Sequence, residues 1–179
     1  IIEGYHQLGL DGLIIIGGDG SMQILRNLAK KGNLNIVAIP KTIDNDVGAT
    51  DVSIGFDTAV QVATQALDNL HSTAVSHSRS MILEVMGRDA GHIALSAGIA
   101  GGADVILIPE IKYSFDKIIS KLHEMKKRNV MHSLIVVAEA VKKENGEKVI
   151  HKFRDGQRRL GGIGEYVANE IMSKTDIEC

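Results

Sequence analysis

The sequence predicts an α/β protein with three layers, in which helices flank a mainly parallel sheet. Short, nearly continuous runs of Ile, Val and Leu alternate with segments of helical periodicity, and such runs are typical of strands buried on both faces. Because strands and helices alternate along the chain, the strands are expected to pair in parallel. The five predicted strands cover residues 12–16, 35–39, 80–86, 103–108 and 133–138.

Helices are predicted between these strands from apolar spacing and from start and stop signals. The helix at 21–31 is expected to end at Gly32, and the helix at 114–128 to begin at Ser114, which favours N-termini. Residues 90–100 are small and apolar all round, which predicts a buried helix. The remaining predicted helices cover residues 1–8, 56–71 and 164–173.

Composition narrows the class of protein. Of the 179 residues, 44% are apolar and 3% aromatic, which suffices for one domain with an aliphatic core. A net charge of -2 gives no electrostatic footprint for nucleic acid. No apolar run reaches the roughly 18 residues that span a bilayer. The single cysteine, Cys179, and the lack of a secretory signal predict a cytoplasmic protein. Residues 142–148 are expected to form a surface turn or hairpin, and the basic stretch 152–159 to lie in solvent.

The glycine-rich segment 17–21, Gly-Gly-Asp-Gly-Ser, follows the first predicted strand, at the end of the sheet where ligands bind in open α/β folds. Glycines let a backbone approach an oligophosphate, and the helix start that follows favours negative charge. An acid there would repel phosphate unless Mg²⁺ lay between, so Asp19 suggests a metal ligand. The alternative is a tight turn in which Asp19 caps the helix.

The segment 40–46, Pro-Lys-Thr-Ile-Asp-Asn-Asp, is the most informative in the chain. An aspartate within reach of an attacking hydroxyl can take its proton during phosphoryl transfer, a second acid can lie near a metal, and Lys41 could supply a cation. A polar turn rich in Asp and Asn is the alternative. Together with the glycine loop, this segment predicts one phosphate-handling site built from two neighbouring strand ends.

Charged residues also flank two later strands. Arg88 follows Met86 and Gly87 at a strand end, where its planar donors suit a sugar phosphate; a surface ion pair is the alternative. Arg79 precedes the same strand, roughly 25–30 Å from Arg88 at the rise of a strand. It is therefore expected to serve a neighbouring subunit, if it serves a site. Glu139 could accept sugar hydroxyls or be a solvated loop acid. The seven histidines show no metal-ligand spacing.

These motifs, in their order, resemble the ATP- or pyrophosphate-dependent 6-phosphofructokinases. The resemblance covers most of residues 11–139 and implies a Rossmann-like topology. It also implies donor loops mainly in residues 11–60 and a sugar-phosphate part mainly in 79–179. The matching segments are GGDGS (17–21), PKTIDND (40–46), GFDTA (55–59), EVMGRDAGHIAL (84–95), AGGADVILIPE (100–110) and VVAE (136–139).

The resemblance implies transfer of a phosphoryl group to the 1-hydroxyl of fructose 6-phosphate, which is a step of glycolysis. It also implies an allosteric enzyme that forms a homo-oligomer, either a dimer or a tetramer. Asp44 would be the catalytic base, with Lys41 as a nearby cation, and Asp19 would hold Mg²⁺ with Asp46 close by. The implied contacts are Thr42, Asp46, Met86, Gly87, Arg88 and Glu139 for fructose 6-phosphate, Arg79 for that of an adjacent subunit, and Gly17, Gly18, Gly20 and Ser21 for the donor.

The identity of the donor depends on two residues. In this family glycine at the position of Gly20 usually accompanies ATP and aspartate accompanies pyrophosphate, because a carboxylate would crowd and repel the α-phosphate. Lys41 is typical of the pyrophosphate enzymes and of a subset of ATP enzymes. Gly20 acts by exclusion, so ATP is the predicted donor and pyrophosphate the alternative.

Several segments of the family are missing from this sequence. These are its N-terminal glycine-rich segment, its nucleotide-contacting arginine loop, and the C-terminal histidine and arginines of the sugar-phosphate pocket. The sequence also lacks an initiator methionine and leaves a helix at 173–179 without a capping element. We therefore expect an internal fragment, the alternative being a processed or tagged form of a small domain. Kinases with a GGDG loop, such as NAD or diacylglycerol kinases, lack the PKTIDND and MGR segments. The presence of Asp44 and Asp19 disfavours a regulatory homologue without activity.

Overall fold

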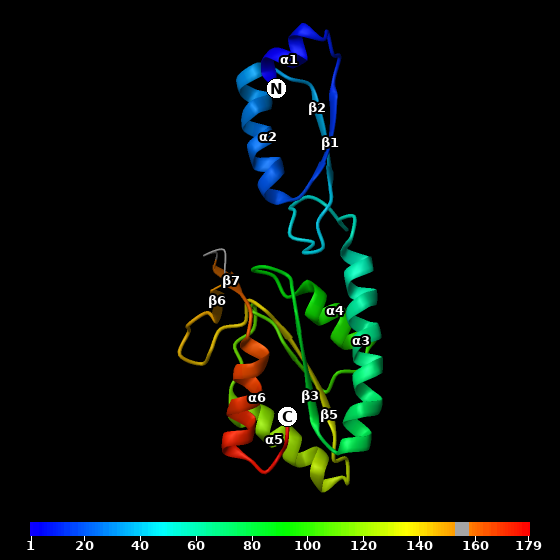
Figure 1. Ribbon diagram of the computed structural model, residues 1–179, viewed down its shortest axis with the longest axis vertical. Coiled ribbons are helices and arrows are strands. Elements are labelled where there is room, and N and C mark those ends of the chain that lie inside the picture. The colour runs from blue at the N-terminus through cyan, green and yellow to red at the C-terminus, as the bar shows by residue number, and fades with distance from the viewer. Residues whose placement is uncertain (153–157) are drawn as a thin grey trace. The chain divides into compact units, whose positions relative to one another are not determined.

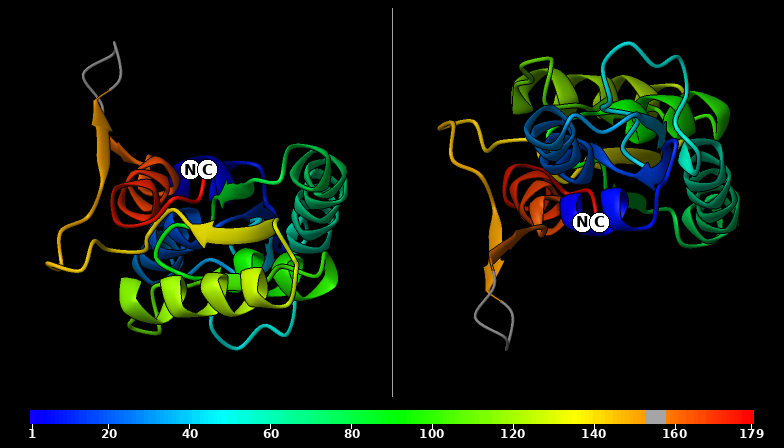
Figure 2. Two further views of the ribbon diagram at one scale, coloured as in Figure 1. Left: turned by 90° about the horizontal axis from the view of Figure 1, so that it is seen from below. Right: turned by 90° about the horizontal axis from the view of Figure 1, so that it is seen from above.

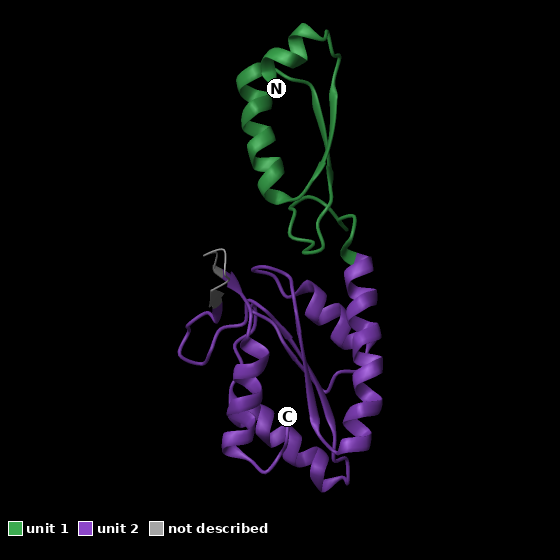
Figure 3. Ribbon diagram, viewed as in Figure 1, with its two compact units in different colours: residues 1–56 green, residues 57–179 purple. Residues whose placement is uncertain are grey.

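The chain folds into two compact units, Ile1–Phe56 and Asp57–Cys179 (Figure 3). The computed structural model describes residues 1–152 and 158–179, except for the side chains of residues 151, 152 and 158. Both units combine parallel strands with helices, so the predicted α/β class with a mainly parallel sheet is confirmed. The basic stretch predicted at 152–159 lies largely outside the described residues.

Unit 1 is a pair of parallel strands joined by a helix, and its elements are α1 (Ile2–Gln7), β1 (Leu13–Gly17), α2 (Asp19–Gly32) and β2 (Ile36–Pro40) (Figure 1). The two strands pair over their whole length, and Gly17 lies beside Pro40 at the end of the ladder. The strands run in parallel, so the segments that leave Gly17 and Pro40 start from the same edge of the sheet. Helix α2 ends one residue later than predicted, because Asn33 rather than Gly32 takes the left-handed cap conformation, with φ of 47°.

Unit 2 is a three-stranded parallel sheet covered by helices, followed by a small antiparallel pair. Its elements are α3 (Phe56–His77), β3 (Ser80–Val85), α4 (His92–Ala100), β4 (Val105–Leu107), α5 (Phe115–Lys127), β5 (Ser133–Ala138), β6 (Ile150–Lys152), β7 (Arg158–Leu160) and α6 (Ile163–Lys174). The strand order is β3-β5-β4. Helix α4 lies on one side of the sheet and α6 on the other, and all six residues of the central strand β5 are buried (Figure 1).

Small residues let α4 pack closely, as its apolar composition predicts. A Cβ atom on Gly98 would lie 2.7 Å from Ile106 Cδ1, and one on Gly101 would lie 2.6 Å from Leu67 Cδ1. Both contacts are shorter than side chains tolerate, so only glycine permits the observed distances between helix α4, strand β4 and helix α3. This packing holds the β3–α4 connection, which carries Arg88, against the sheet.

Two parts of unit 2 differ from the prediction. Helix α3 runs six residues beyond position 71, to His77. This end is polar but buries Ala74, which packs it against the rest of the unit, and the hydroxyls of Thr73 and Ser76 donate to carbonyls one turn earlier. Strands β6 and β7 were not predicted because only one of the three residues in each is apolar, whereas the equally short β4 is apolar throughout. Figure 2 shows this pair standing outside the layers of unit 2. The hairpin predicted at 142–148 is confirmed by an antiparallel bridge between Lys142 and Lys148.

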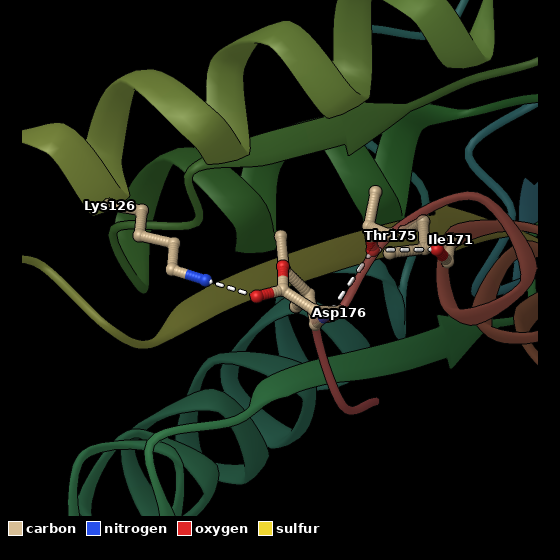
Figure 4. A network of polar contacts seen from close by, with 5 residues as sticks. Lys126, Ile171, Thr175 and Asp176 are labelled. Atoms are coloured by element: carbon tan, nitrogen blue, oxygen red, sulfur yellow. Dashed lines mark hydrogen bonds and ion pairs between the residues drawn. The ribbon is translucent and has the colours of Figure 1, made fainter.

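The segment after α6 folds back onto the amino end of the sheet (Figure 4). Thr175 Oγ1 donates to the Ile171 carbonyl at 2.7 Å, and Lys126 Nζ donates to Asp176 Oδ2 at 2.6 Å. Two residues further on, the Glu178 carbonyl accepts from the Ser80 amide at 2.9 Å. Helices α5 and α6 are thereby tied to the start of β3 by charged and backbone hydrogen bonds.

Candidate functional site

The glycine loop is a tight strand-to-helix connection at the end of β1. Gly18 is the N-cap residue of α2 and makes no side-chain cap hydrogen bond. A Cβ atom on Gly17 would lie 2.9 Å from Ser21 Cβ, so the turn requires glycine there. Asp19 does not cap the helix, because it is the first helical residue and its carboxylate accepts from Gln23 Nε2 at 3.1 Å. The N–H groups of the first turn of α2 therefore have no side-chain cap from Gly18 or Asp19.

The segment after β2 turns a carboxylate inward. Asp44 is only 8% exposed, although it lies in a loop. Thr42 Oγ1 donates to Asp44 Oδ2 at 3.2 Å and accepts from the Asp44 amide at the same distance. Lys41 and Asp46, by contrast, are exposed at either side of this turn. The loop therefore presents one oriented, largely desolvated carboxylate between two solvated charges.

Two residues that sequence reasoning missed hold this loop in place. Ser53 is 2% exposed, and its hydroxyl donates to the Thr42 carbonyl at 2.8 Å. Its amide donates to Asn45 Oδ1 at 2.9 Å, while Asn45 adopts the left-handed conformation with φ of 52°. An asparagine between two aspartates is a recognisable signal for such a turn. No local signal marks Ser53, since its role depends on residues eight and eleven positions earlier.

The structure brings the two predicted loops of unit 1 together. The Lys41 amide extends the β1–β2 ladder by donating to the Gly17 carbonyl at 2.8 Å. A Cβ atom on Gly18 would lie 3.6 Å from both the Lys41 carbonyl oxygen and Thr42 Cβ, which is van der Waals contact. The glycine loop and the Asp44 loop are therefore neighbours at one edge of one sheet, as parallel strands require.

Unit 2 has an open hollow of about 830 Å³ at the carboxyl ends of β3 and β5. Three residues predicted to bind the sugar, Met86, Arg88 and Glu139, line it together. Glu84, Arg159 and Leu160 also line the hollow, and none of them was predicted. Arg159 comes from β7, a strand that was not predicted. The sequence thus indicated one wall of this hollow and missed the other.

Glu139 organises the turn that carries Arg88. Its Oε1 accepts from the Gly87 amide at 3.2 Å and from the Arg88 amide at 2.9 Å. Both residues of the turn have positive φ, 152° at Gly87 and 53° at Arg88. Residues with a side chain rarely adopt such values, so Glu139 stabilises a turn that would otherwise be unfavourable. One carboxylate oxygen therefore orders the arginine turn, whatever else Glu139 binds.

Arg79 lies at the other end of β3 and is not part of the hollow. It immediately precedes the strand, whereas Arg88 follows it. Its Nε donates to Glu178 Oε2 at 2.6 Å, and its side chain is 47% exposed. The structure therefore separates Arg79 from the other predicted sugar-binding residues of this unit.

An ion pair joins the arginine turn to the 142–148 hairpin. Lys148 Nζ lies 2.7 Å from Asp89 Oδ1. The hydrogen bond and positive charge of Lys148 lower the pKa of the Asp89 carboxyl below its usual value. Because Asp89 is highly exposed, this pair contributes little to stability. It does show that the arginine turn and the 142–148 hairpin are neighbours.

The described part of the chain has neither a cluster of metal-ligating side chains nor a membrane-spanning helix. Residues 1–152 and 158–179 contain no cluster of three or more His, Cys, Asp or Glu side chains that could hold a metal. None of their helices has the length and apolar character needed to cross a membrane.

Fold and site together define an α/β protein with a glycine loop and an acidic loop at the ends of neighbouring parallel strands. The chain belongs to the phosphofructokinase family, whose model matches residues 1–179. It is 62% identical over 178 residues to ATP-dependent 6-phosphofructokinase 1 of Nostoc sp., covering 99% of this chain and 50% of that protein. It is 50% identical over 173 residues to ATP-dependent 6-phosphofructokinase 2 of Clostridium perfringens, covering 95% and 47%.

Solved structures agree with this assignment. A pyrophosphate-dependent phosphofructokinase from Nitrosospira multiformis is similar with a TM-score of 0.77 and 25% identity, over 99% of this chain and 45% of that one. Phosphofructokinase from Saccharomyces cerevisiae is similar with a TM-score of 0.66 and 32% identity, over 82% and 23%. The chain spans about half the length of the curated relatives it matches.

Proposed function

We propose that the protein, at its natural length, transfers a phosphoryl group from ATP to the 1-hydroxyl of fructose 6-phosphate, as a cytoplasmic enzyme of glycolysis. The observation that carries this proposal is the buried Asp44 at the end of β2, beside the glycine loop, in a chain of the phosphofructokinase family. Relatives at 62% and 58% identity that bear the name ATP-dependent 6-phosphofructokinase support it.

In this proposal Asp44 is the catalytic base. The attacking hydroxyl must lose a proton, and a carboxylate within hydrogen-bond reach can accept it. The Thr42 hydroxyl donates to one oxygen of Asp44 and thereby orients the carboxylate. Lys41 offers an exposed cation to the transferred group, where charge must be offset.

The donor phosphates are proposed to bind at the glycine loop of Gly17, Gly18, Gly20 and Ser21. A magnesium ion held by nucleotide phosphates needs only one or two protein carboxylates. Asp19 supplies one in the first turn of α2, and the exposed Asp46 follows the neighbouring strand. These residues fit Mg²⁺, which, when bound, would offset the negative charge of the donor phosphates.

Fructose 6-phosphate is proposed to contact Thr42, Met86, Gly87, Arg88 and Glu139. The common hollow of Met86, Arg88 and Glu139 supports this set. Arg79 is proposed to contact the sugar phosphate bound by an adjacent copy of the chain, which makes the protein a homo-oligomer. Its place at the opposite end of β3 from Arg88 supports this role.

The role of Asp44 is tested by changing Asp44 to Ser in the protein at its natural length and measuring fructose 1,6-bisphosphate formation in a coupled assay. We expect kcat to fall about 10²- to 10⁴-fold, since the proton acceptor is lost. Asp11→Ser is the matched control, because Asp11 is exposed before the amino end of β1. Turnover of Asp44→Ser within threefold of the unchanged protein would contradict the assignment.

The donor is tested by assaying ATP and pyrophosphate side by side, and by changing Gly20 to Asp. Nothing lies within 4 Å of a Cβ atom at Gly20, so the new side chain fits without displacing its neighbours. An acid in the first turn of a helix is also favourable for stability. We expect the melting temperature to hold while the KM for ATP rises at least tenfold. Higher activity of the unchanged protein with pyrophosphate than with ATP would overturn the choice of donor.

A further inference from the structure

A pocket of about 340 Å³ lies in unit 2 between the segment 108–113, which follows β4, and the 142–148 hairpin. It shares no residue with the hollow or with the loops of unit 1. We propose that this pocket binds a small phosphomonoester, with its phosphate at Lys112 and Lys142 and its organic part on the apolar wall. That wall is formed by Ile108, Pro109, Ile111 and Val141.

The charges that line the pocket favour an anion. Three lysines and one carboxylate, that of Glu144, line it. Glu144 Oε1 already accepts from the Phe115 amide at 2.9 Å, and one of the lysines lies over an aromatic ring. The other two, Lys112 and Lys142, are exposed and form no ion pair with any residue that the structure describes. Their two ammonium groups match the charge of a phosphomonoester, which is roughly −1.5 to −2 at neutral pH.

A tyrosine of the same pocket has a buried hydroxyl without a partner. Tyr113 lines the pocket, and its hydroxyl oxygen is buried with no hydrogen bond to the described part of the chain. Burial raises the pKa of Tyr113, so the hydroxyl keeps its proton and remains a donor. Buried polar groups rarely lack a partner. A shift of the Tyr113 ring toward the pocket would let the hydroxyl donate to a phosphate oxygen and so gain the partner that it lacks.

The two walls of the pocket also hold the arginine turn. On one side, Glu110 Oε1 accepts from the Gly91 amide at 2.8 Å. On the other side, Lys148 Nζ lies 2.7 Å from Asp89 Oδ1, and the charge of Lys142 adds to the effect of Lys148 on the pKa of Asp89. A ligand that draws Lys142 into the pocket or moves either wall therefore acts on this turn. This regulatory step rests on the proposed function, because the turn is proposed to contact fructose 6-phosphate.

The test is a titration of the protein at its natural length with phenyl phosphate, followed by the methyl resonances of Ile111, which is 67% exposed. We expect saturable shifts of these resonances. In the double variant Lys112→Ala/Lys142→Ala, the dissociation constant should rise at least tenfold, because two charge-assisted hydrogen bonds are lost. The matched control is Lys121→Ala/Lys127→Ala, since both lysines are exposed on α5 outside the pocket. The control should bind within twofold of the unchanged protein.

The contact with the tyrosine has a test of its own. Tyr113→Phe removes only a hydroxyl that has no hydrogen-bond partner, so the melting temperature should hold or rise. The dissociation constant of phenyl phosphate should nevertheless rise about three- to tenfold, as the loss of one hydrogen bond predicts. An unchanged dissociation constant would show that the hydroxyl does not meet the ligand and would overturn this contact.

Two further probes separate the parts of the ligand. Benzoate carries one negative charge on the same ring, and inorganic phosphate lacks an apolar part, so both should bind more weakly than phenyl phosphate. Benzoate binding as tightly as phenyl phosphate would overturn the assignment to a phosphomonoester. Phenyl phosphate that causes no saturable shift at Ile111, or that binds the double lysine variant as tightly as the unchanged protein, would overturn the site itself.

Failure of this inference differs from failure of the proposed function, because binding at Ile111 requires no turnover. In the active protein, saturating phenyl phosphate should shift the Gly91 amide resonance and change the KM for fructose 6-phosphate at least twofold. Lys112→Ala/Lys142→Ala should abolish both effects, which separates them from competition at the substrate site. Turnover with neither effect would overturn the link to the arginine turn while the function stands. Without turnover the proposed function fails, and the Gly91 resonance still decides the link.

Discussion

Changing Gly87 to Ala tests how the arginine turn is built. Gly87 has φ of 152°, and a Cβ atom there would lie 2.4 Å from the Ala90 carbonyl oxygen. The backbone conformation alone costs roughly 1–3 kcal/mol for a residue with a side chain. Relief of the clash must move Ala90, whose amide donates to the Gly87 carbonyl at 3.0 Å. Loss of that bond adds about 1 kcal/mol. We therefore expect a total loss of roughly 2–4 kcal/mol in the free energy of unfolding of unit 2.

Native-state hydrogen exchange of the buried β5 amides measures this loss within unit 2, where a change of about 3 kcal/mol accelerates globally limited exchange by roughly a hundredfold. Gly146→Ala is the matched control, because Gly146 also has positive φ, 86°, but nothing lies within 4 Å of its Cβ position. We expect Gly146→Ala to lower the free energy of unfolding by about 1–2 kcal/mol, from the backbone conformation alone. If Gly87→Ala lowers the free energy of unfolding no more than Gly146→Ala does, the close approach of Gly87 to Ala90 does not constrain the turn.

Three further predictions concern the loop of unit 1 and the segment after α6. Ser53→Ala should lower the local stability of the loop by about 1–2 kcal/mol, because the Thr42 carbonyl loses a buried donor. Hydrogen exchange measures this loss, and Ser53→Thr, which keeps the hydroxyl, should lower the stability less. The hydrogen bond and charge of Lys126 lower the pKa of Asp176, so the pair stabilises the native state above about pH 4 and loses this contribution as the pH falls through the lowered pKa. The segment 175–179 should loosen as the pH falls below about pH 4, and Lys126→Ala should remove that step. Burial raises the pKa of the Cys179 thiol, so its alkylation at pH 8 should be slower in the native protein than in urea; equal rates would contradict its burial.

Local patterns sufficed to predict the main strands and helices of both units. Strand β5 was predicted at residues 133–138 because six apolar or small residues in a row suit a strand buried on both faces, and those are its observed bounds. Ser114 was predicted to begin α5, and its Oγ accepts from the Lys117 amide at 3.4 Å. The strands β6 and β7 were not predicted, because each has only one apolar residue and their pairing depends on a partner elsewhere in the chain.

Asp44 was predicted as a site residue from its neighbours in the chain, whereas the role of Glu84 could not be predicted in this way. By itself the sequence determined the order of strands and helices and the strand ends at which polar residues gather, since these follow from apolar runs and glycines close together in the chain. Only the tertiary structure decided that Glu84 caps a helix 78 residues later, that Glu139 orders a turn 52 residues earlier, and that Arg159 shares a hollow with Arg88. The physical reason is that a hydrogen bond acts over about 3 Å, and only folding brings such distant residues that close.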